Sequence, residues 1–313
     1  MSRIKIFAAT LGLAASVSAS TAFAADAESC KKVRLSDVGW TDIQATTGVA
    51  SVLLTALGYE PEVIQLSVPV TYASLKNNDL DVFLGNWMPS MTADIKDYAA
   101  EGSVETVGEN LSGAGYGLVV PTYMADAGVK TLADLAKPEI KEKLGGKVYG
   151  IEAGNDGNRI ILDMIAKPDS GLAGYELVES SEAGMLTQAE QSMKDNQWIV
   201  FLGWTPHPVM GEMKISYLDG MGDSGFGAAT VLTNVRKGYV AECPNVGKFI
   251  TNLKFDLSME NTMMDAILKG GNANDVATEW LKKNPDAATP WLTGVTTFDG
   301  GDAAAAVKTA LGS

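Results

Sequence analysis

Two matching stretches of the chain each lead an apolar run into a tryptophan. VFLGNWMP at 82–89 and VFLGWTP at 200–206 both read Val-Phe-Leu-Gly, then Trp87 or Trp204, then a proline two positions on. The apolar run indicates a strand, so each indole would lie at a strand's carboxyl end, where open α/β sheets bind ligands. One such tryptophan is often only a lid on the core, but two copies in matching contexts favour a ligand site.

Three further residues are predicted to lie at the same crevice. Trp40 follows a predicted strand, Tyr116 lies in GAGYGLVVP (113–121), and Asn155 lies in a loop, EAGNDG (152–157), between a strand and a helix. A quaternary ammonium group cannot donate N–H bonds, but ring faces attract its charge by roughly 0.5–2 kcal/mol per ring. The sequence therefore predicts an aromatic cage built from Trp40, Trp87, Tyr116 and Trp204.

Asp42, two residues after Trp40, would supply the counter-ion for such a cation. A carboxylate in the first turn of a helix is also favourable against the helix dipole, so its spacing alone leaves the role open. Asn155 could equally satisfy the backbone of its loop, and Tyr116 is similarly balanced. The other tryptophans lack a strand-end position and are predicted to be packing residues: Trp198, Trp280 and Trp291.

The scaffold that would bring these residues together is predicted from alternating strand and helix patterns, which are typical of α/β proteins. The first half has predicted strands at 32–38, 63–66 and 81–84 and helices at 42–57 and 72–77. The second half repeats the scheme with strands at 147–151, 175–178 and 198–202 and helices at 158–166 and 182–196. Beyond Glu260 the pattern is helical. We expect each half to form a mixed, mainly parallel sheet flanked by helices.

Two glycine-rich entries into strands, at 113–120 and 225–232, are predicted to be the crossings between two lobes. Lobe I would then be discontinuous, with residues 26–113 and 225–313, and lobe II would hold residues 114–224. The ligand site would lie in the cleft between them.

The first residues are predicted to be a secretory signal peptide. Residues 1–24 combine a basic start, an apolar run too short to span a bilayer and Ala22-Phe23-Ala24, which fits a signal peptidase site. We therefore expect an exported, periplasmic protein. Without Arg3 and Lys5 its net charge is −14 − 2 = −16. This acidity argues against nucleic acid and anionic membrane surfaces as partners, and it suits a cationic solute.

Cys30 and Cys243 are the two cysteines of the chain. In an oxidising compartment two cysteines more often pair than remain free, and a loop of this length is worth roughly 4–5 kcal/mol in the chain-entropy model. The alternative is two buried thiols. Pairing would place the N-terminus and the region near 243 in one lobe.

Patterns that suggest an enzyme are incomplete. Gly222-Asp223-Ser224-Gly225 is similar to a serine-protease motif, but that chemistry needs a histidine base, and the single histidine, His207, lies in a proline-bracketed turn. One histidine and two paired cysteines also provide too few ligands for a typical zinc site. We expect no catalytic residue, metal or cofactor, and His207 is predicted to shape the turn after Trp204.

At these residues the chain resembles the periplasmic substrate-binding proteins of ABC importers for glycine betaine and choline. The resemblance covers the mature chain and is carried by GWTDIQATTGVASVLLTALGYE (39–60), VFLGNWMPS (82–90), GAGYGLVVP (113–121), GIEAGNDGN (150–158) and WTPHPV (204–209). It implies a type II fold of two hinged lobes, a monomer that delivers its ligand to an inner-membrane permease, and an aromatic box at the four cage positions. Asp42 and Asn155 match the polar positions that handle the rest of choline.

Choline is favoured over betaines by the charges near the predicted site. A betaine carboxylate needs donors such as arginine, and none of the three arginines of the mature chain stands at a predicted strand end. Asp42 would repel that carboxylate but complements the net charge of choline. Acetylcholine and betaines would be weaker ligands. A glycine betaine or proline betaine binding protein, a periplasmic choline-ester enzyme and a chemosensory binding protein remain the alternatives.

Overall fold

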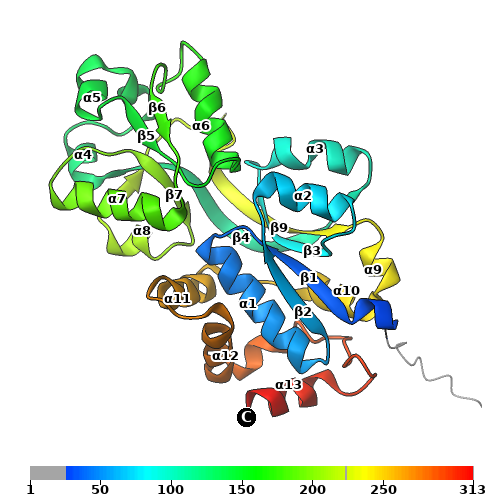
Figure 1. Ribbon diagram of the computed structural model, residues 1–313. Coiled ribbons are helices and arrows are strands. Elements are labelled where there is room, and N and C mark those ends of the chain that lie inside the picture. Colours follow the sequence, from blue (N-terminus) through cyan, green and yellow to red (C-terminus); the bar gives the residue numbers. More distant parts are fainter. Residues whose placement is uncertain (1–25, 223, 313) are drawn as a thin grey trace, which may run out of the picture.

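The computed structural model describes residues 26–222 and 224–312, so the predicted signal peptide lies outside the described residues. This part of the chain forms one mixed sheet with helices packed around it (Figure 1). Its strands are β1 (Lys32–Asp37), β2 (Glu60–Gln65), β3 (Val82–Met88), β4 (Val104–Pro121), β5 (Lys147–Tyr149), β6 (Glu176–Val178), β7 (Phe201–Thr205), β8 (Ile215–Tyr217) and β9 (Gly227–Arg236).

The helices cover both ends of this sheet (Figure 1). Those of the first half are α1 (Thr41–Ala56), α2 (Val68–Lys76) and α3 (Thr92–Ala100). The middle of the chain adds α4 (Thr122–Asp126), α5 (Pro138–Lys143), α6 (Asp156–Ala166), α7 (Glu182–Lys194) and α8 (Val209–Glu212). The last part adds α9 (Tyr239–Glu242), α10 (Pro244–Asn252), α11 (Leu257–Leu268), α12 (Ala273–Lys283) and α13 (Ala303–Leu311). Short 3-10 helices are η1 (Glu28–Cys30), η2 (Leu132–Ala136) and η3 (Pro285–Ala288).

The strand order is β2-β1-β3-β9-β4-β7-β5-β6, with β8 paired to β4. The outer pairs β1–β2, β1–β3, β5–β6 and β5–β7 are parallel, as the strand–helix alternation predicts. The central pairs made by β4 and β9 are antiparallel. The α/β class with a mixed sheet is confirmed, and its antiparallel part arises because both long strands run between the lobes in opposite directions.

Strand β4 joins the lobes and is longer than the sequence pattern indicates. It pairs with β9 from Val104 to Tyr116 and with β7 from Gly115 to Val119, so it changes partners near Tyr116. The glycine-rich segment after Gly113 is therefore the middle of this strand and not its start. Figure 1 shows α4 to α8 gathered on one side of β4 and β9, and α1 to α3 with the C-terminal helices on the other. The lobe boundaries at 113 and 225 stay a prediction.

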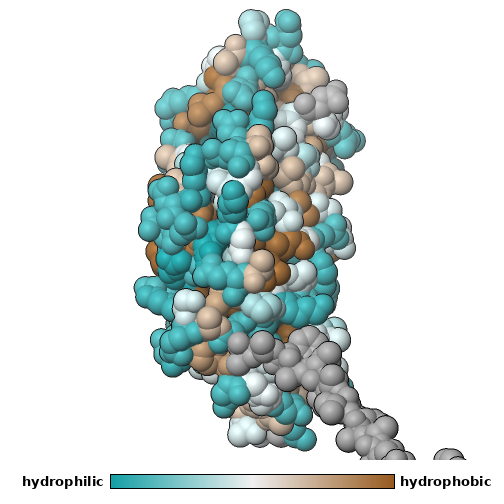
Figure 2. All heavy atoms as spheres, turned by 90° about the vertical axis from the view of Figure 1, so that its right-hand side faces the viewer, coloured by the Kyte–Doolittle hydropathy of each residue, from teal (hydrophilic) through white to brown (hydrophobic). Residues whose placement is uncertain are grey.

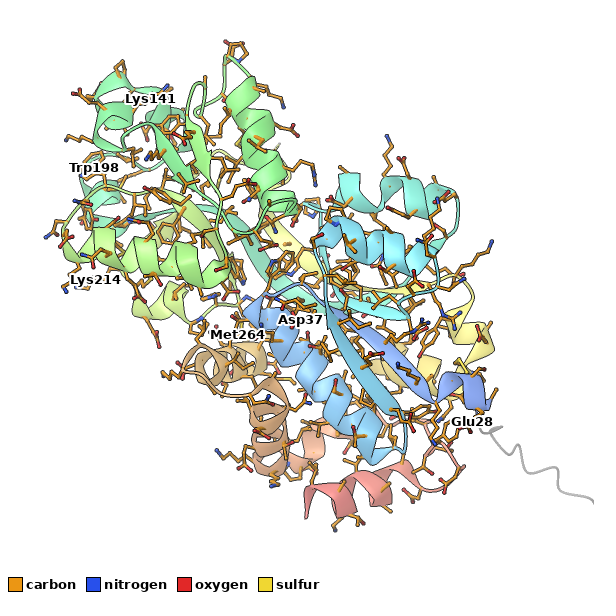
Figure 3. The ribbon with its side chains drawn as sticks, viewed as in Figure 1. Glu28, Asp37, Lys141, Trp198, Lys214 and Met264 are labelled. Carbon is orange, nitrogen blue, oxygen red and sulfur yellow. A yellow bond between two sulfur atoms is a disulfide. The ribbon has the colours of Figure 1, made fainter. Side chains whose placement is uncertain are left out.

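Helix α1 places two predicted site residues at the carboxyl end of β1. Trp40 is its N-cap residue in an extended conformation, and Asp42 lies in its first turn. The helix is buried along most of its length, between the sheet and helices α11 and α12. Gly48 permits this close packing, since a Cβ atom there would lie 2.8 Å from the backbone oxygen of Ala273 on α12. Figure 3 labels Asp37 at the end of β1, where the two lobes meet.

Cys30 and Cys243 form a disulfide, with their Cα atoms 5.6 Å apart. The pairing predicted from the sequence is thus confirmed. The bond ties η1 to the N-terminus of α10 within the same lobe. In the described part of the chain no helix has both the length and the apolar character that crossing a bilayer requires. The face in Figure 2 is largely hydrophilic, with hydrophobic residues scattered in small groups.

Candidate functional site

Four buried aromatic residues surround one hollow at the junction of the lobes. The hollow is small, with a cavity volume of about 10 Å³, and it is lined by Trp40, Asp42, Trp87, Tyr116, Ile151, Asp156 and Trp204. The four aromatic side chains are each at most 5% exposed. Five of the six predicted ligand-binding residues therefore lie together, and Asn155 stands just behind the wall.

Strand register sets the positions of these rings. Trp87 lies near the end of β3, and Trp204 lies near the end of β7, as the repeated motif predicts. Tyr116 of β4 is directly opposite Trp204 in the antiparallel ladder. The ring centroids of Tyr116 and Trp204 are 6.4 Å apart and nearly perpendicular, and those of Trp87 and Tyr116 are 5.9 Å apart.

Hydrogen bonds at the polar edges fix the orientation of three rings. Trp40 Nε1 donates to Glu152 Oε1 at 2.8 Å, and Trp87 Nε1 donates to Asp42 Oδ2 at 3.1 Å. The hydroxyl of Tyr116 donates to Asn155 Oδ1 at 3.2 Å. With the polar edges engaged in this way, the ring faces remain available to a ligand.

Asn155 has a structural task in addition to this contact. It is the N-cap residue of α6, and its Oδ1 accepts the backbone N–H of Asn158 at 3.1 Å. Its Nδ2 donates to Asp156 Oδ1 at 3.1 Å. The backbone role that the sequence left open is therefore present, and Asn155 connects Tyr116 with Asp156.

Two carboxylate oxygens on the wall lack a partner. Asp42 is 2% exposed and Asp156 is fully buried, and Asp42 Oδ1 and Asp156 Oδ2 have no hydrogen bond of ordinary geometry within the described residues, although Ser90 lies close enough to Asp156 to lower its pKa. Buried polar atoms are almost always satisfied in folded proteins, because leaving them unpaired is costly. Two such oxygens at one hollow suit a cation or a hydrogen-bond donor.

The acidic groups around the hollow are hard to ionise because they are buried. Burial, with the nearby charge of Glu182, raises the pKa of Asp42 to about 7. Burial likewise raises the pKa of Asp156 to about 6 and that of Glu152 to about 7. A cation in the hollow would favour the ionised forms and lower these pKa values.

Sequence reasoning missed Asp156, Ile151 and the supporting Glu152. Asp156 directly follows Asn155 and begins α6 at the end of the second-half strand, which is the position that singled out Asp42. Two rings outside the predicted cage also support it. Phe226 packs edge-on against Tyr116 at 5.2 Å, and His207 packs edge-on against Trp204 at 4.8 Å.

The enzyme-like motif does not assemble a catalytic pair in the described residues. Ser224 Oγ donates to the backbone oxygen of Met221, whereas His207 Nε2 lies 3.1 Å from Glu182 Oε1. The single group of metal-ligand side chains in this part of the chain contains both disulfide sulfurs, which are not free thiolates. Trp198 lies at the outer edge of its lobe under Lys143 Nζ at 4.3 Å, away from the hollow (Figure 3).

Two α/β lobes with an aromatic hollow between them define the class as a hinged ligand-binding protein. Residues 31–283 match the family model described as the substrate binding domain of ABC-type glycine betaine transport systems, and the chain belongs to this family. Members of this family are transport proteins that capture a solute for an importer.

Solved structures agree with this assignment. A choline-binding protein of an ABC transporter, in complex with choline, is 56% identical over 91% of this chain and all of its own, with a TM-score of 0.89. The unliganded, semi-closed form has the same identity and coverage and a TM-score of 0.83. The lactococcal protein OpuAC, closed on glycine betaine, is 25% identical over 83% of this chain and 99% of its own, with a TM-score of 0.75.

Proposed function

We propose that this protein captures choline in the aromatic hollow and delivers it to the membrane permease of an ABC importer. The observation that carries this proposal is the meeting of four buried aromatic rings with unpaired carboxylate oxygens around one hollow. Ring faces would hold the trimethylammonium group, and Asp42 or Asp156 would accept the hydroxyl proton. The 56% identical neighbour with choline bound supports the choice of ligand.

The charges at the hollow favour choline over glycine betaine. All three arginines outside the predicted signal peptide are engaged elsewhere: Arg34 and Arg236 bind Asp81, and Arg159 binds Asp94. A betaine carboxylate would therefore meet two buried acids and no arginine. Betaines are thus weaker ligands, and acetylcholine, which keeps the cation but lacks the hydroxyl proton, is intermediate.

Closure of the lobes would complete the cage. We place lobe I at residues 26–113 and 225–313 and lobe II at 114–224, so Trp40 and Trp87 face Tyr116 and Trp204 across the cleft. Hydrogen bonds from Trp40 to Glu152 and from Arg159 to the backbone oxygen of Ser90 join the two sides. A ligand that contacts both sides favours the closed state because it binds that state more tightly. The closed form would then dock on the permease.

The setting that fits this function is the periplasm, with residues 1–24 removed after export. We infer that the chain is not an enzyme, since capture for transport needs reversible binding. Incubation with acetylcholine tests the choline-ester alternative: a binding protein gives a saturable tryptophan signal and no choline release. A transport assay with the cognate permease separates import from a chemosensory role.

Calorimetric titration with choline, acetylcholine, glycine betaine and proline betaine tests the ligand assignment. The expected order of affinity places choline first and both betaines last. Tighter binding of a betaine would contradict the assignment and would require a carboxylate-binding group in the hollow.

A further inference from the structure

We propose that Glu182 is a closure latch, which fastens lobe II to the first turn of α1 and holds the cage shut on its ligand. We use latch for the contacts among Glu182, Thr41 and His207. The inference rests on the proposed function for its ligand, but its contacts are independent of which ligand binds. None of the three residues lines the hollow.

The first contact joins the N-termini of two helices that belong to different lobes. Glu182 begins α7 and Thr41 begins α1. The backbone N–H of Thr41 donates to Glu182 Oε2 at 2.9 Å, and its hydroxyl donates to Oε1 at 2.5 Å. The first N–H groups of a helix have no partner within the helix, and a carboxylate there is favoured by the dipole. Glu182 thus caps α1 from the opposite lobe.

His207 supplies a third donor to the same carboxylate. The backbone N–H of Val209 donates to His207 Nδ1 at 3.2 Å, so Nδ1 carries the lone pair and the neutral ring has its proton on Nε2. Nε2 lies 3.1 Å from Glu182 Oε1 and donates to it. Glu182 is only 4% exposed, and a buried carboxylate needs such donors. Opening the cleft would remove the two donors of Thr41 and leave that of His207.

The latch is coupled to the cage through its immediate neighbours. Thr41 stands between Trp40 and Asp42, which both line the hollow. On the other side, the ring of His207 packs edge-on against Trp204 at 4.8 Å. The contact that closes the lobes therefore also sets the positions of cage residues from both of them. Glu182 is a positioning residue that acts on bound ligand through closure.

Stopped-flow tryptophan fluorescence with choline tests the latch on the full mature chain. For Glu182→Gln we expect the dissociation rate constant to rise at least tenfold, while the association rate constant changes less than threefold because encounter uses the open form. Thr41→Val should also raise the dissociation rate constant. Thr41→Ser, which keeps the hydroxyl, should have the wild-type dissociation rate constant. Glu190→Gln, an exposed acid on the same helix, is the control and should leave both rates unchanged.

Two results separate this inference from the proposed function. If wild-type protein binds choline and Glu182→Gln or Thr41→Val, once shown folded by circular dichroism, releases it at the wild-type rate, the latch is overturned and the function stands. If wild-type protein binds no quaternary ammonium compound, the proposed function fails, and the latch is judged without ligand. Small-angle X-ray scattering should then give a larger radius of gyration for Glu182→Gln than for wild type. Equal radii of gyration for the two proteins would overturn the latch.

Discussion

At the residue scale, Trp40, Trp87 and Tyr116 each have a polar edge held by the protein and a face left for the ligand, whereas Trp204 Nε1 has no hydrogen-bond partner within the described residues. Asp42 shows the principle most clearly, because one of its oxygens accepts from Trp87 Nε1 and the other is unpaired within the described residues. The same carboxylate thus orients a ring and supplies charge to the hollow. Removing a ring and removing the charge should have separable effects.

Trp87→Ala and Trp204→Ala should each weaken choline binding at least tenfold, about 1.4 kcal/mol or more, because each removes one ring face from the cation. Isothermal titration calorimetry measures the change. Trp198→Ala, at the outer edge of lobe II, is the matched control and should bind choline like wild type. Wild-type affinity in both cage variants would refute the cage.

Asp42→Asn should lower choline affinity about tenfold relative to glycine betaine, because it removes an attractive charge for one ligand and a repulsive charge for the other. The asparagine can still accept the Trp87 hydrogen bond, so ring orientation is preserved. Competition titrations give the ratio of the two affinities. An unchanged ratio would show that Asp42 does not determine the preference for choline over glycine betaine.

Choline affinity should fall as pH drops below about 7. Burial raises the pKa of Asp42 to about 7, and a bound cation stabilises the ionised form, so binding is weakened wherever the free protein holds the proton. Affinity should be nearly constant above pH 8. In Asp42→Asn the fall should be shallower, because only Glu152, with a pKa of about 7, and Asp156, with a pKa of about 6, still titrate near the hollow. The same profile in both proteins would contradict the assignment to Asp42.

At the element scale, the sequence predicts best where apolar periodicity is strong and local. Helix α1 and strands β3 and β7 end within a few residues of their predicted bounds, and both motif tryptophans lie at strand ends. Strand β4 is predicted only from Gly113 onward because the apolar residues of its earlier half, Val104, Val107 and Leu111, are three and four positions apart and do not alternate as in a regular strand, and its pairing includes register shifts. Its pairing with β9 joins residues far apart in sequence, which local patterns do not encode.

The start of the strand predicted at 198–202 is also set by contacts that local sequence patterns do not encode. β7 begins only at Phe201, because Trp198 packs under Lys143 of α5 and does not enter the sheet. Asp156 was missed for a related reason. A carboxylate at a helix N-terminus is already explained by the helix dipole, so the sequence gives no reason to assign Asp156 to the site. Only the three-dimensional structure shows its unpaired oxygen at the hollow.

Helix α1 depends on the absence of a side chain at Gly48. A Cβ atom there would lie 2.8 Å from the backbone oxygen of Ala273, and backbone cannot move aside as a flexible side chain does. We expect Gly48→Ala to reduce the free energy of unfolding by about 1–3 kcal/mol, although alanine is the better helix former. Urea denaturation measures this. Gly211→Ala, on α8 with open space around it, should be neutral or slightly stabilising, and equal behaviour of both variants would contradict the packing argument.

At the scale of the whole molecule, the disulfide joins two residues that are 213 positions apart and closes a loop that contains all of the predicted lobe II. Cross-linking lowers the entropy of the unfolded chain, so Cys30→Ala with Cys243→Ala should lower stability by about 2–5 kcal/mol. Neither cysteine lines the hollow, and Glu28 of the same short helix η1 lies far from the second-half helices in Figure 3. Choline affinity should therefore stay within about twofold of wild type. A lower melting temperature with a large loss of affinity would instead tie the bond to the site.

The central claim is that rings from two lobes meet around one methylated nitrogen, and a crystal structure of the mature protein with choline tests it most directly. The account predicts the nitrogen within about 6 Å of the ring centroids of at least three of Trp40, Trp87, Tyr116 and Trp204. It also predicts the choline hydroxyl within hydrogen-bond distance of Asp42 or Asp156. Choline bound outside the hollow, or held there through one lobe alone, would contradict the account.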